Sequence, residues 1–421
     1  MLRTAPLLLV VFCTGCTFVV GQALEEAKAN IAEGEGDEGE GAEGEEGEGE
    51  EGEGEEGEGN EGEGEAVNDN DPACEEDERL LVARDDDGTD VFQVYDLLPG
   101  RFRRRTPNNN GANVNLENDD PIAAGNGFSV DSFALGTEGR LYLTGGSFLY
   151  QLSASTLTQQ NIAAKPQLRA SSIYAVQVVG STIVLSGDTI ETIPEGPAVG
   201  ERPVEVPGQA SNYHRSVKFS VDGEDFVAIN GEYGYVVLSS VAGAPPTTTV
   251  VYDEDFTEVR FHSYGGGTFT PRGIAFDTTT RQLLLGDLGR VIVLDYDSGF
   301  SIGDPNDDAG DFVLPNDSDA PVQAIATRGG FAFVLFERGN DNLLKLDLSQ
   351  SPPVAVAVAT VATSSFGRDI AVGCRRVVVA AQNDLIAVSR DDLSPVATNA
   401  PGSLGHIAIV KKSALGLAGD D

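Results

Sequence analysis

The chain has 421 residues, with 68 Asp and Glu against 27 Lys and Arg, and its formal net charge is −41. A protein this acidic is a poor candidate for binding DNA, RNA or anionic lipid, because phosphate recognition needs a basic surface. Residues 33–65 contain 17 Glu, one Asp and 13 Gly, so this tract alone holds −18 of the charge. The remaining residues are less acidic per residue, and they carry the information about fold and function.

The N-terminus predicts export. Residues 1–15 have the pattern of a signal peptide, in which Arg3 precedes the apolar run 7–12. That run is too short to span a bilayer as a helix. It ends in Cys13-Thr14-Gly15-Cys16, which resembles the lipobox of bacterial lipoproteins, although Cys13 stands where that family usually has an aliphatic residue. The resemblance implies acylation of Cys16, and Thr17 after it implies sorting to the outer membrane.

Ordinary signal cleavage after Gly21-Gln22-Ala23 is the alternative, and it would give a secreted or periplasmic protein. Either route delivers the chain to an oxidising compartment. Beyond the processing region only Cys74 and Cys374 remain as cysteines.

The acidic tract predicts a tether. From Glu43 to Gly57 the unit Glu-Gly-Glu-Glu-Gly is repeated three times. The tract has no large apolar side chain to bury and its charges repel one another, so we expect residues 33–73 to be disordered. They follow a short segment, 16–32, and precede a globular region, 74–421. The alternative is a tail that collects calcium or binds a protein.

The globular region predicts a repeated β-structure. After Asp71-Pro72 the chain consists of short β-rich runs separated by Gly, Asp, Asn and Pro. A unit of four strands recurs, most clearly at residues 272–277, 282–287, 290–295 and 311–314. The first strands of successive units are centred on residues about 46 positions apart, which is the size of one propeller blade. These central residues are Ala134, Ala175, Lys218, Ala275, Ala326, Ala371 and Ala408.

The first and last predicted strands of the region are each missing a partner strand. Residues 80–83 have the pattern of a second strand without a first, and residues 405–410 that of a first strand without a second. Pairing them closes the ring and removes exposed edges. The sequence therefore predicts an all-β, seven-bladed β-propeller with ring closure by the C-terminal strand. In that arrangement Cys74 and Cys374 lie on the same face of adjacent blades, which predicts a disulfide between them.

This pattern resembles the broad group of bacterial secreted propellers related to WD-repeat, YVTN and lactonase-like proteins, over roughly residues 75–421. The Gly-His…Trp-Asp signature is missing, and the chain has no Trp at all. The absence of Trp argues against the quinone-dependent dehydrogenases, whose repeats carry docking tryptophans. A resemblance to lactonase-like propellers would imply a calcium ion in the channel. Three arginines expected at the channel mouth, Arg215, Arg272 and Arg368, disfavour a cation there. The resemblance supplies no active-site residues.

The entry ends of the first strands predict a binding site at one mouth of the central channel. Arg215, Arg272 and Arg368 would clamp an anionic ligand such as a carboxylate, a sulfate or a sugar acid. Alternatively, each Arg pairs with an acid from a nearby turn and holds the blades in register. The mouth positions are Asp131, Ser172, Arg215, Arg272, Gln323, Arg368 and Gly405, with His214, Asp369 and His406 beside them.

Evidence for metal binding or catalysis is thinner. Asp304, Asn306, Asp308 and Asp311 place oxygens at alternate positions and form a candidate calcium site, as do residues 85–90. Neither segment is an EF-hand, and solvated turns are the alternative. The three histidines, His214, His262 and His406, show no zinc spacing, and there is no nucleophile elbow or phosphate loop. Residues 260–269 are expected to overhang the same mouth, as a recognition loop or a tolerated insertion.

The sequence therefore predicts a monomeric binding module for a protein, a glycan or a small anion. It would be tethered by a lipid at the outer membrane or cell surface of a bacterium, with calcium as its only candidate cofactor and no nucleic-acid partner. The alternative is a hydrolase or lyase at the channel mouth, calcium-dependent or not. The enzyme would need a metal or a His–carboxylate pair converging there.

Overall fold

The computed structural model describes the chain over part of its length, and the described residues lie in the unit Gly64–Asp421. The predicted signal peptide, Cys16 and the acidic tether lie outside them. The secondary structure of the described part is almost entirely β, with short 3-10 helices η2 (Thr137–Gly139) and η4 (Lys412–Leu415). The described residues are 74, 76–84, 92–104, 130–145, 148–153, 159–163, 172–195, 204–205, 213–231, 234–239, 257–263, 273–286, 290–298, 311–313, 321–337, 341–361, 367–381, 383–400, 402 and 404–415.

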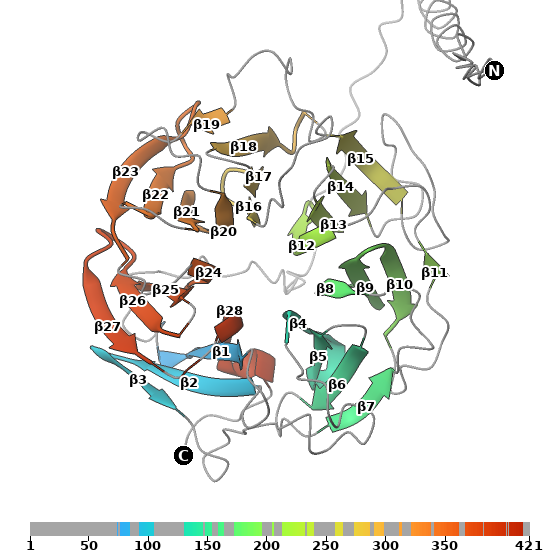
Figure 1. The fold of residues 1–421 in the computed structure, drawn as a ribbon. Coiled ribbons are helices and arrows are strands. Elements are labelled where there is room, and N and C mark those ends of the chain that lie inside the picture. Colours follow the sequence, from blue (N-terminus) through green and yellow to red (C-terminus); the bar gives the residue numbers. More distant parts are fainter. Residues whose placement is uncertain are drawn as a thin grey trace, which may run out of the picture. The chain divides into compact units, whose positions relative to one another are not determined.

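The described strands form seven four-stranded antiparallel sheets (Figure 1). One sheet combines the two ends of the region and has the order β28 (Leu404–Lys411), β1 (Glu78–Arg84), β2 (Phe92–Leu98) and β3 (Arg101–Arg104). The next contains β4 (Ser132–Leu135), β5 (Arg140–Gly145), β6 (Phe148–Ser153) and β7 (Gln159–Ala163). It is followed by β8 (Ile173–Val179), β9 (Thr182–Gly187), β10 (Ile190–Pro194) and β11 (Val204–Glu205).

The other four sheets repeat this pattern along the chain. They are β12 (Tyr213–Val221), β13 (Glu224–Gly231), β14 (Gly234–Ser239) and β15 (Thr257–Ser263); β16 (Ile274–Asp277), β17 (Gln282–Gly286), β18 (Arg290–Asp295) and β19 (Asp311–Val313); β20 (Val322–Arg328), β21 (Phe331–Phe336), β22 (Leu343–Asp347) and β23 (Val354–Ala359); and β24 (Gly367–Val372), β25 (Arg376–Ala381), β26 (Leu385–Ser389) and β27 (Pro395–Asn399). Each expected central residue, from Ala134 to Ala408, lies in the first strand of its unit.

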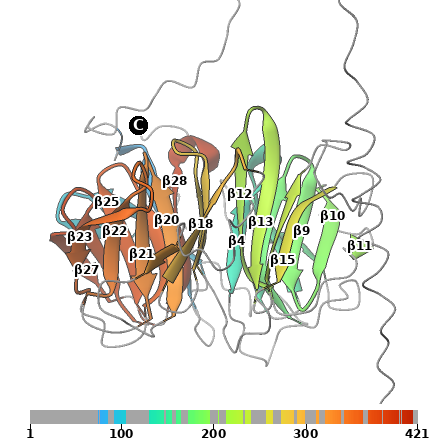
Figure 2. The same cartoon turned by 90° about the horizontal axis from the view of Figure 1, so that it is seen from above.

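The sheets stand around a common centre, which gives a propeller-like arrangement. The strands nearest that centre contact one another in the order β4, β8, β12, β16, β20, β24 and β28, and β28 also contacts β4 (Figure 1). Viewed at right angles, the strands run between two faces of the unit (Figure 2). The inner strands therefore surround one central axis, which we call the channel, and their entry ends lie on one face of the unit, which we call its mouth.

Strand β28 is the last strand of the described part and pairs with β1, the first. It pairs antiparallel with β1, with Leu81 opposite Ala408 and Glu78 opposite Lys411. The pairing expected between residues 80–83 and 405–410 is thus present. It places the last inner strand beside a strand more than 300 residues earlier in the chain.

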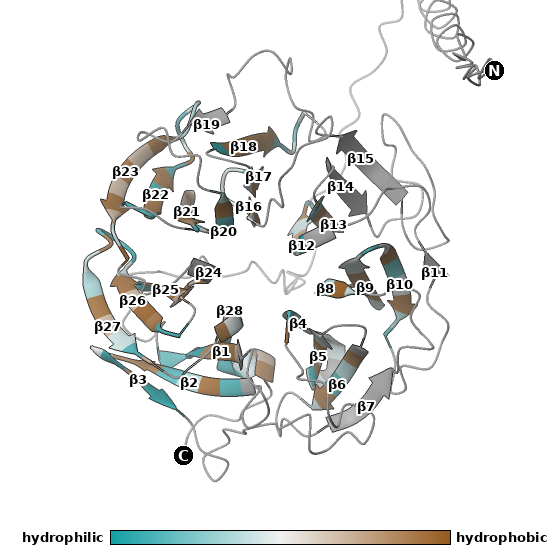
Figure 3. Cartoon of the chain, in the orientation of Figure 1, coloured by the Kyte–Doolittle hydropathy of each residue, from teal (hydrophilic) through white to brown (hydrophobic). Residues whose placement is uncertain are grey.

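Burial explains why each strand has its composition. Middle strands such as β25, with the sequence RVVVAA, are buried at every position, because neighbouring sheets cover both of their faces. Outer strands such as β23 alternate between exposed and half-buried residues. Apolar side chains gather in clusters between adjacent sheets, as with Leu81 of β1, Leu141 of β5 and Tyr150 of β6. The colouring of the strands by hydropathy shows hydrophobic stretches in β18, β22 and β26 (Figure 3). The sheets are therefore held together face to face by hydrophobic burial.

Tight hairpins connect the first and second strands at the far end of the channel. Asp222 and Gly223 both have positive φ, 54° and 82°, as a two-residue type I′ turn requires. Gly329 and Gly330, with φ of 61° and 79°, do the same between β20 and β21. In the described part of the chain, no helix is long and apolar enough to cross a membrane.

Candidate functional site

Three side chains from different sheets meet at the channel. Arg215 of β12, Asp369 of β24 and His406 of β28 are each the third residue of their strand. His406 Nδ1 contacts Asp369 Oδ2, and Arg215 Nη1 lies 3.2 Å from the same Nδ1. We call these three residues the channel cluster.

Arg215 and His406 of the channel cluster come from strands that are not neighbours. Going round the ring, β4 and β8 lie between β28 and β12 on one side, and β16, β20 and β24 lie between them on the other. Arg215 therefore reaches His406 from across the channel rather than from an adjacent sheet. The contact also places the entry ends of these strands at the same mouth.

The Asp369 contact favours one proton arrangement of the imidazole, in which Nδ1 and Arg215 Nη1 are both donors and make no hydrogen bond to each other. Nδ1 faces a carboxylate and a guanidinium together, and only a protonated Nδ1 can donate to the carboxylate. If Nδ1 were bare, its lone pair would face the negative oxygen of Asp369. We therefore assign the Nδ1 proton to the Asp369 contact, which leaves Nε2 as the nitrogen directed elsewhere.

Asp369 is the anchor of the channel cluster. Its Oδ2 accepts from the backbone N–H of Ile407 and its Oδ1 from that of Ile370, both at 2.9 Å. Burial raises the pKa of this carboxyl, but His406, Arg215 and the Ile407 N–H together outweigh burial and hold the pKa below its usual range. Asp369 is thus a buried anion that links β24 to β28.

The imidazole is more accessible than its carboxylate. The side chain of His406 is 22% exposed and that of Asp369 is 8% exposed. Arg215 is half-buried. The ring of Phe133, from β4, lies 4.7 Å from the His406 ring between centroids. A molecule entering the mouth would therefore meet the nitrogen-bearing groups before the anion.

The other predicted mouth residues have varied positions. Gln323, the second residue of β20, is buried. Asp131 is half-buried just before β4, and its backbone N–H donates to the carbonyl of Thr144. The carbonyl of Ser172 accepts from the N–H of Asp188, and Gly405 lies on β28.

Several predicted residues cannot be placed. Arg272, Asp304, Asn306 and Asp308 lie outside the described residues, as do residues 264–269 of the irregular segment. The backbones of His214, His262, Asp311 and Arg368 belong to β12, β15, β19 and β24, but their side chains are not described. The calcium site and two of the three mouth arginines therefore stay predictions.

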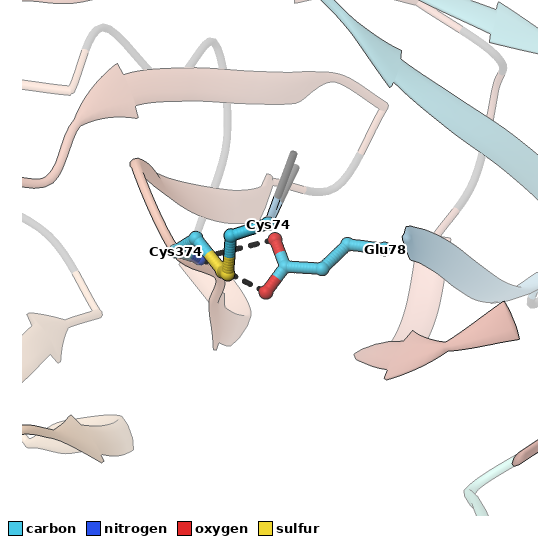
Figure 4. A group of neighbouring side chains, drawn as sticks. All are labelled: Cys74, Glu78 and Cys374. Atoms are coloured by element: carbon cyan, nitrogen blue, oxygen red, sulfur yellow. Dashed lines mark hydrogen bonds between the residues drawn. A yellow bond between two sulfur atoms is a disulfide. The ribbon is translucent and has the colours of Figure 1, made fainter. Parts of the chain in front are cut away.

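A second polar cluster surrounds the predicted disulfide. Cys74 and Cys374 are joined, with their Cα atoms 6.1 Å apart. Cys374 lies in the turn between β24 and β25, and its backbone N–H donates to both oxygens of the Glu78 carboxylate at 3.0 Å (Figure 4). Arg328 bridges Glu78 Oε1 and Cys374 Sγ, both at 3.0 Å.

Cys74, Cys374 and Glu78 are close enough to offer a metal three ligand atoms. The chemistry of this group does not suit a cation. The sulfurs are oxidised to a disulfide, whereas a metal needs thiolates. The guanidinium of Arg328 already occupies the position next to the carboxylate. We therefore interpret this cluster as a structural bridge.

Sequence reasoning missed some residues that matter here. The sequence places Asp369 only beside the mouth positions. Asp369 lies two residues before the central residue Ala371, just as Ser132 lies two residues before the central residue Ala134. Ser132 Oγ accepts from the N–H of Val176 on the next inner strand, as Asp369 does from Ile407. That shared position could have identified Asp369. No sequence signal indicated Phe133 or Arg328.

Comparison with known proteins gives distant structural similarity only. No family model matches the chain, and no curated protein matches it. Apo AztD from Citrobacter koseri is similar with a TM-score of 0.47 and 12% identity, over 79% of this chain and 98% of that one. PorZ of Porphyromonas gingivalis, a surface component of the type-IX secretion system, is similar with a TM-score of 0.44 and 15% identity, over 66% of this chain. The match spans 34% of PorZ. Similarity at this level supports no conclusion about function.

Proposed function

We propose that the chain is an exported, lipid-tethered, seven-bladed β-propeller whose central channel binds a small anionic ligand at the channel cluster. Cys16 would be the lipid anchor, and residues 33–73 the tether. Strand β28 would close the ring by completing the sheet of β1, β2 and β3. The seven four-stranded sheets and the β28–β1 pairing support this architecture.

One observation carries the proposed ligand class. Asp369 contacts the imidazole of His406 and is itself bonded to two backbone N–H groups, and Arg215 reaches the same imidazole nitrogen from across the channel. The nitrogen-bearing groups are also the more accessible ones. A half-buried guanidinium suits the carboxylate of a ligand, because it can donate two parallel hydrogen bonds. Arg272 and Arg368, which the sequence predicts at the same mouth, would add to its positive potential.

Calorimetric titration tests the proposal. Glucuronate and succinate would serve as probes for the full mature chain and for Arg215→Gln. We expect binding to the natural protein and at least tenfold weaker binding to Arg215→Gln. Arg281→Gln is the matched control, because Arg281 pairs with Asp222 and Asp297 in exposed turns. Equal affinity in a properly folded Arg215→Gln protein would reject this site.

The His406–Asp369 pair favours a second candidate, a hydrolase or lyase at the same mouth. A carboxylate that fixes the Nδ1 proton of a histidine leaves Nε2 oriented to accept a proton from a substrate or a water molecule. For this enzyme, His406→Gln would abolish turnover of glucuronate esters while leaving their binding within about threefold. A binding module would show no turnover in either protein.

A further inference from the structure

The two sulfurs of the Cys74–Cys374 bridge have different surroundings. Cys374 is 1% exposed, whereas Cys74 is half-buried. Cys374 lies in the turn between β24 and β25, and its backbone N–H holds it against the carboxylate of Glu78 (Figure 4). A thiol that approaches from solvent therefore reaches the sulfur of Cys74 more readily than that of Cys374.

Arg328 adds a second difference between the two sulfurs. Its Nη2 lies 3.0 Å from Cys374 Sγ and 3.7 Å from Cys74 Sγ. A positive charge beside a sulfur stabilises the thiolate that forms when a disulfide opens, and a stabilised thiolate is the better leaving group. Arg328 is therefore placed to receive negative charge on Cys374 rather than on Cys74.

The fold fixes the guanidinium of Arg328 in this position. Arg328 is the last residue of β20, and it pairs with Phe331 of β21 across the turn at Gly329 and Gly330. Only 25% of its side chain is exposed. Partial burial strengthens the interaction of the guanidinium with a nearby negative charge, because less water screens it.

The nearby carboxylate of Glu78 does not cancel this preference. Both of its oxygens accept from the N–H of Cys374, and Oε1 also pairs with Arg328 Nη1 at 3.0 Å. These contacts compensate its charge in place. A guanidinium has five N–H donors, so Arg328 can hold Glu78 through Nη1 and a Cys374 thiolate through Nη2 at the same time.

We propose that Cys74 is a site of covalent modification by low-molecular-weight thiols, through thiol–disulfide exchange. The thiolate of the incoming thiol attacks Cys74 Sγ and forms a new sulfur–sulfur bond with it. The Cys74–Cys374 bond breaks, and its electron pair leaves on Cys374 Sγ as a thiolate beside Arg328. One sulfur–sulfur bond replaces another, so the thiol is the only co-reactant. The site lies among the turns at the far end of the channel and does not depend on ligand binding at the mouth.

Mass spectrometry of the full mature chain tests the direction of attack and needs no variant. The protein is exposed briefly to 2-mercaptoethanol, and excess N-ethylmaleimide then traps the free thiols. We expect the mercaptoethanol adduct on Cys74 and the maleimide on Cys374, at a rate proportional to the thiol concentration. An adduct mainly on Cys374, or equal adducts on both residues, would overturn the proposal. A rate independent of thiol concentration would also overturn it, because opening of the fold would then limit the reaction.

Arg328→Gln separates stabilisation of the thiolate from a structural role. Loss of the charge beside Cys374 should make the reaction with 2-mercaptoethanol at least about threefold slower. If Arg328 only held the turns together, its loss would loosen the cluster and make the reaction faster, so an equal or faster rate would overturn the proposal. Arg328→Lys keeps the charge and should stay within about twofold of the natural rate.

Arg281→Gln is the matched control for these rates. The side chain of Arg281 is 33% exposed and pairs with a carboxylate, Asp222, as that of Arg328 does with Glu78. Neither cysteine is among its printed partners, Asp222, Asp297 and Tyr296. Its loss should therefore change the rate less than about twofold.

Discussion

Asp369 on β24 accepts a hydrogen bond from the backbone N–H of Ile407 on β28 at 2.9 Å. This single contact connects the β24–β27 sheet to β28, the strand that pairs with β1. The same carboxylate holds His406, which contacts Arg215 from across the channel. The group that positions the candidate site therefore also fastens the join between the two ends of the fold.

Removing the Asp369 charge should weaken the fold. In Asp369→Asn the amide oxygen can still accept from Ile407, but His406 and Arg215 lose their buried anion. We expect a loss of about 1–3 kcal/mol in the free energy of unfolding, measured by urea denaturation. Asp297→Asn is the control: its side chain is 69% exposed and its pair with Arg281 is a surface one, so a change below about 0.5 kcal/mol is expected. Equal effects of the two substitutions would contradict the anchoring role.

The contribution of Asp369 should depend on pH in one direction. Its pKa is lower in the folded protein than its ordinary value near 4. A depressed carboxyl pKa stabilises the fold at pH values above the unfolded pKa, and this stabilisation is lost as the pH falls through the folded value. The difference in unfolding free energy between the natural protein and Asp369→Asn should be present at about pH 5 and shrink as the pH falls below about 4. Exposed acids with lowered pKa, such as Asp392, are common to both proteins and cancel in the difference. A difference that grows as the pH falls below about 4 would refute this assignment.

The disulfide should stabilise the ring more than any single contact near it. Cys74 and Cys374 are 300 residues apart in the chain, so the bridge removes much conformational freedom from the unfolded state. We expect Cys74→Ser/Cys374→Ser to lose about 2–5 kcal/mol, measured by guanidinium denaturation without reductant. The natural protein with reductant should approach the same value. Mass spectrometry that finds both thiols free in the natural protein, purified without reductant, would contradict the bridge.

The sequence predicts the sheets well for a physical reason. Each middle strand is covered on both faces, so it is a continuous apolar run such as residues 283–285, and the Gly and Asp turns around it mark its ends. The Cys74–Cys374 pairing follows from the expected order of the blades. Both features depend on local pattern and topology, which a repeated sequence shows directly.

The candidate site was only partly predictable. Arg215 and His406 were expected at one mouth, but their contact depends on the width of the channel and on the side-chain rotamers, which no spacing along the chain reveals. The role of Asp369 in joining β24 to β28 required the register of two distant strands. Strand β3 was not predicted because the sequence of Arg101–Arg104 lacks the apolar alternation that identifies a strand.

Close packing between backbone segments gives a last, purely steric prediction. A Cβ added at Gly187, the last residue of β9, would lie 1.9 Å from the carbonyl oxygen of Ser172, which also accepts from the N–H of Asp188. The neighbour is backbone and cannot rotate away, so Gly187→Ala must displace the start of β8. We expect a loss of about 3 kcal/mol in unfolding free energy, measured by thermal and urea denaturation. Gly139→Ala is the comparison, because its Cβ meets nothing within 4 Å and only its φ of +67° opposes the substitution. That change should cost about 1 kcal/mol. A smaller loss of unfolding free energy for Gly187→Ala than for Gly139→Ala would contradict the close contact between Gly187 and Ser172. That contact sets the position of the start of β8 at the channel mouth.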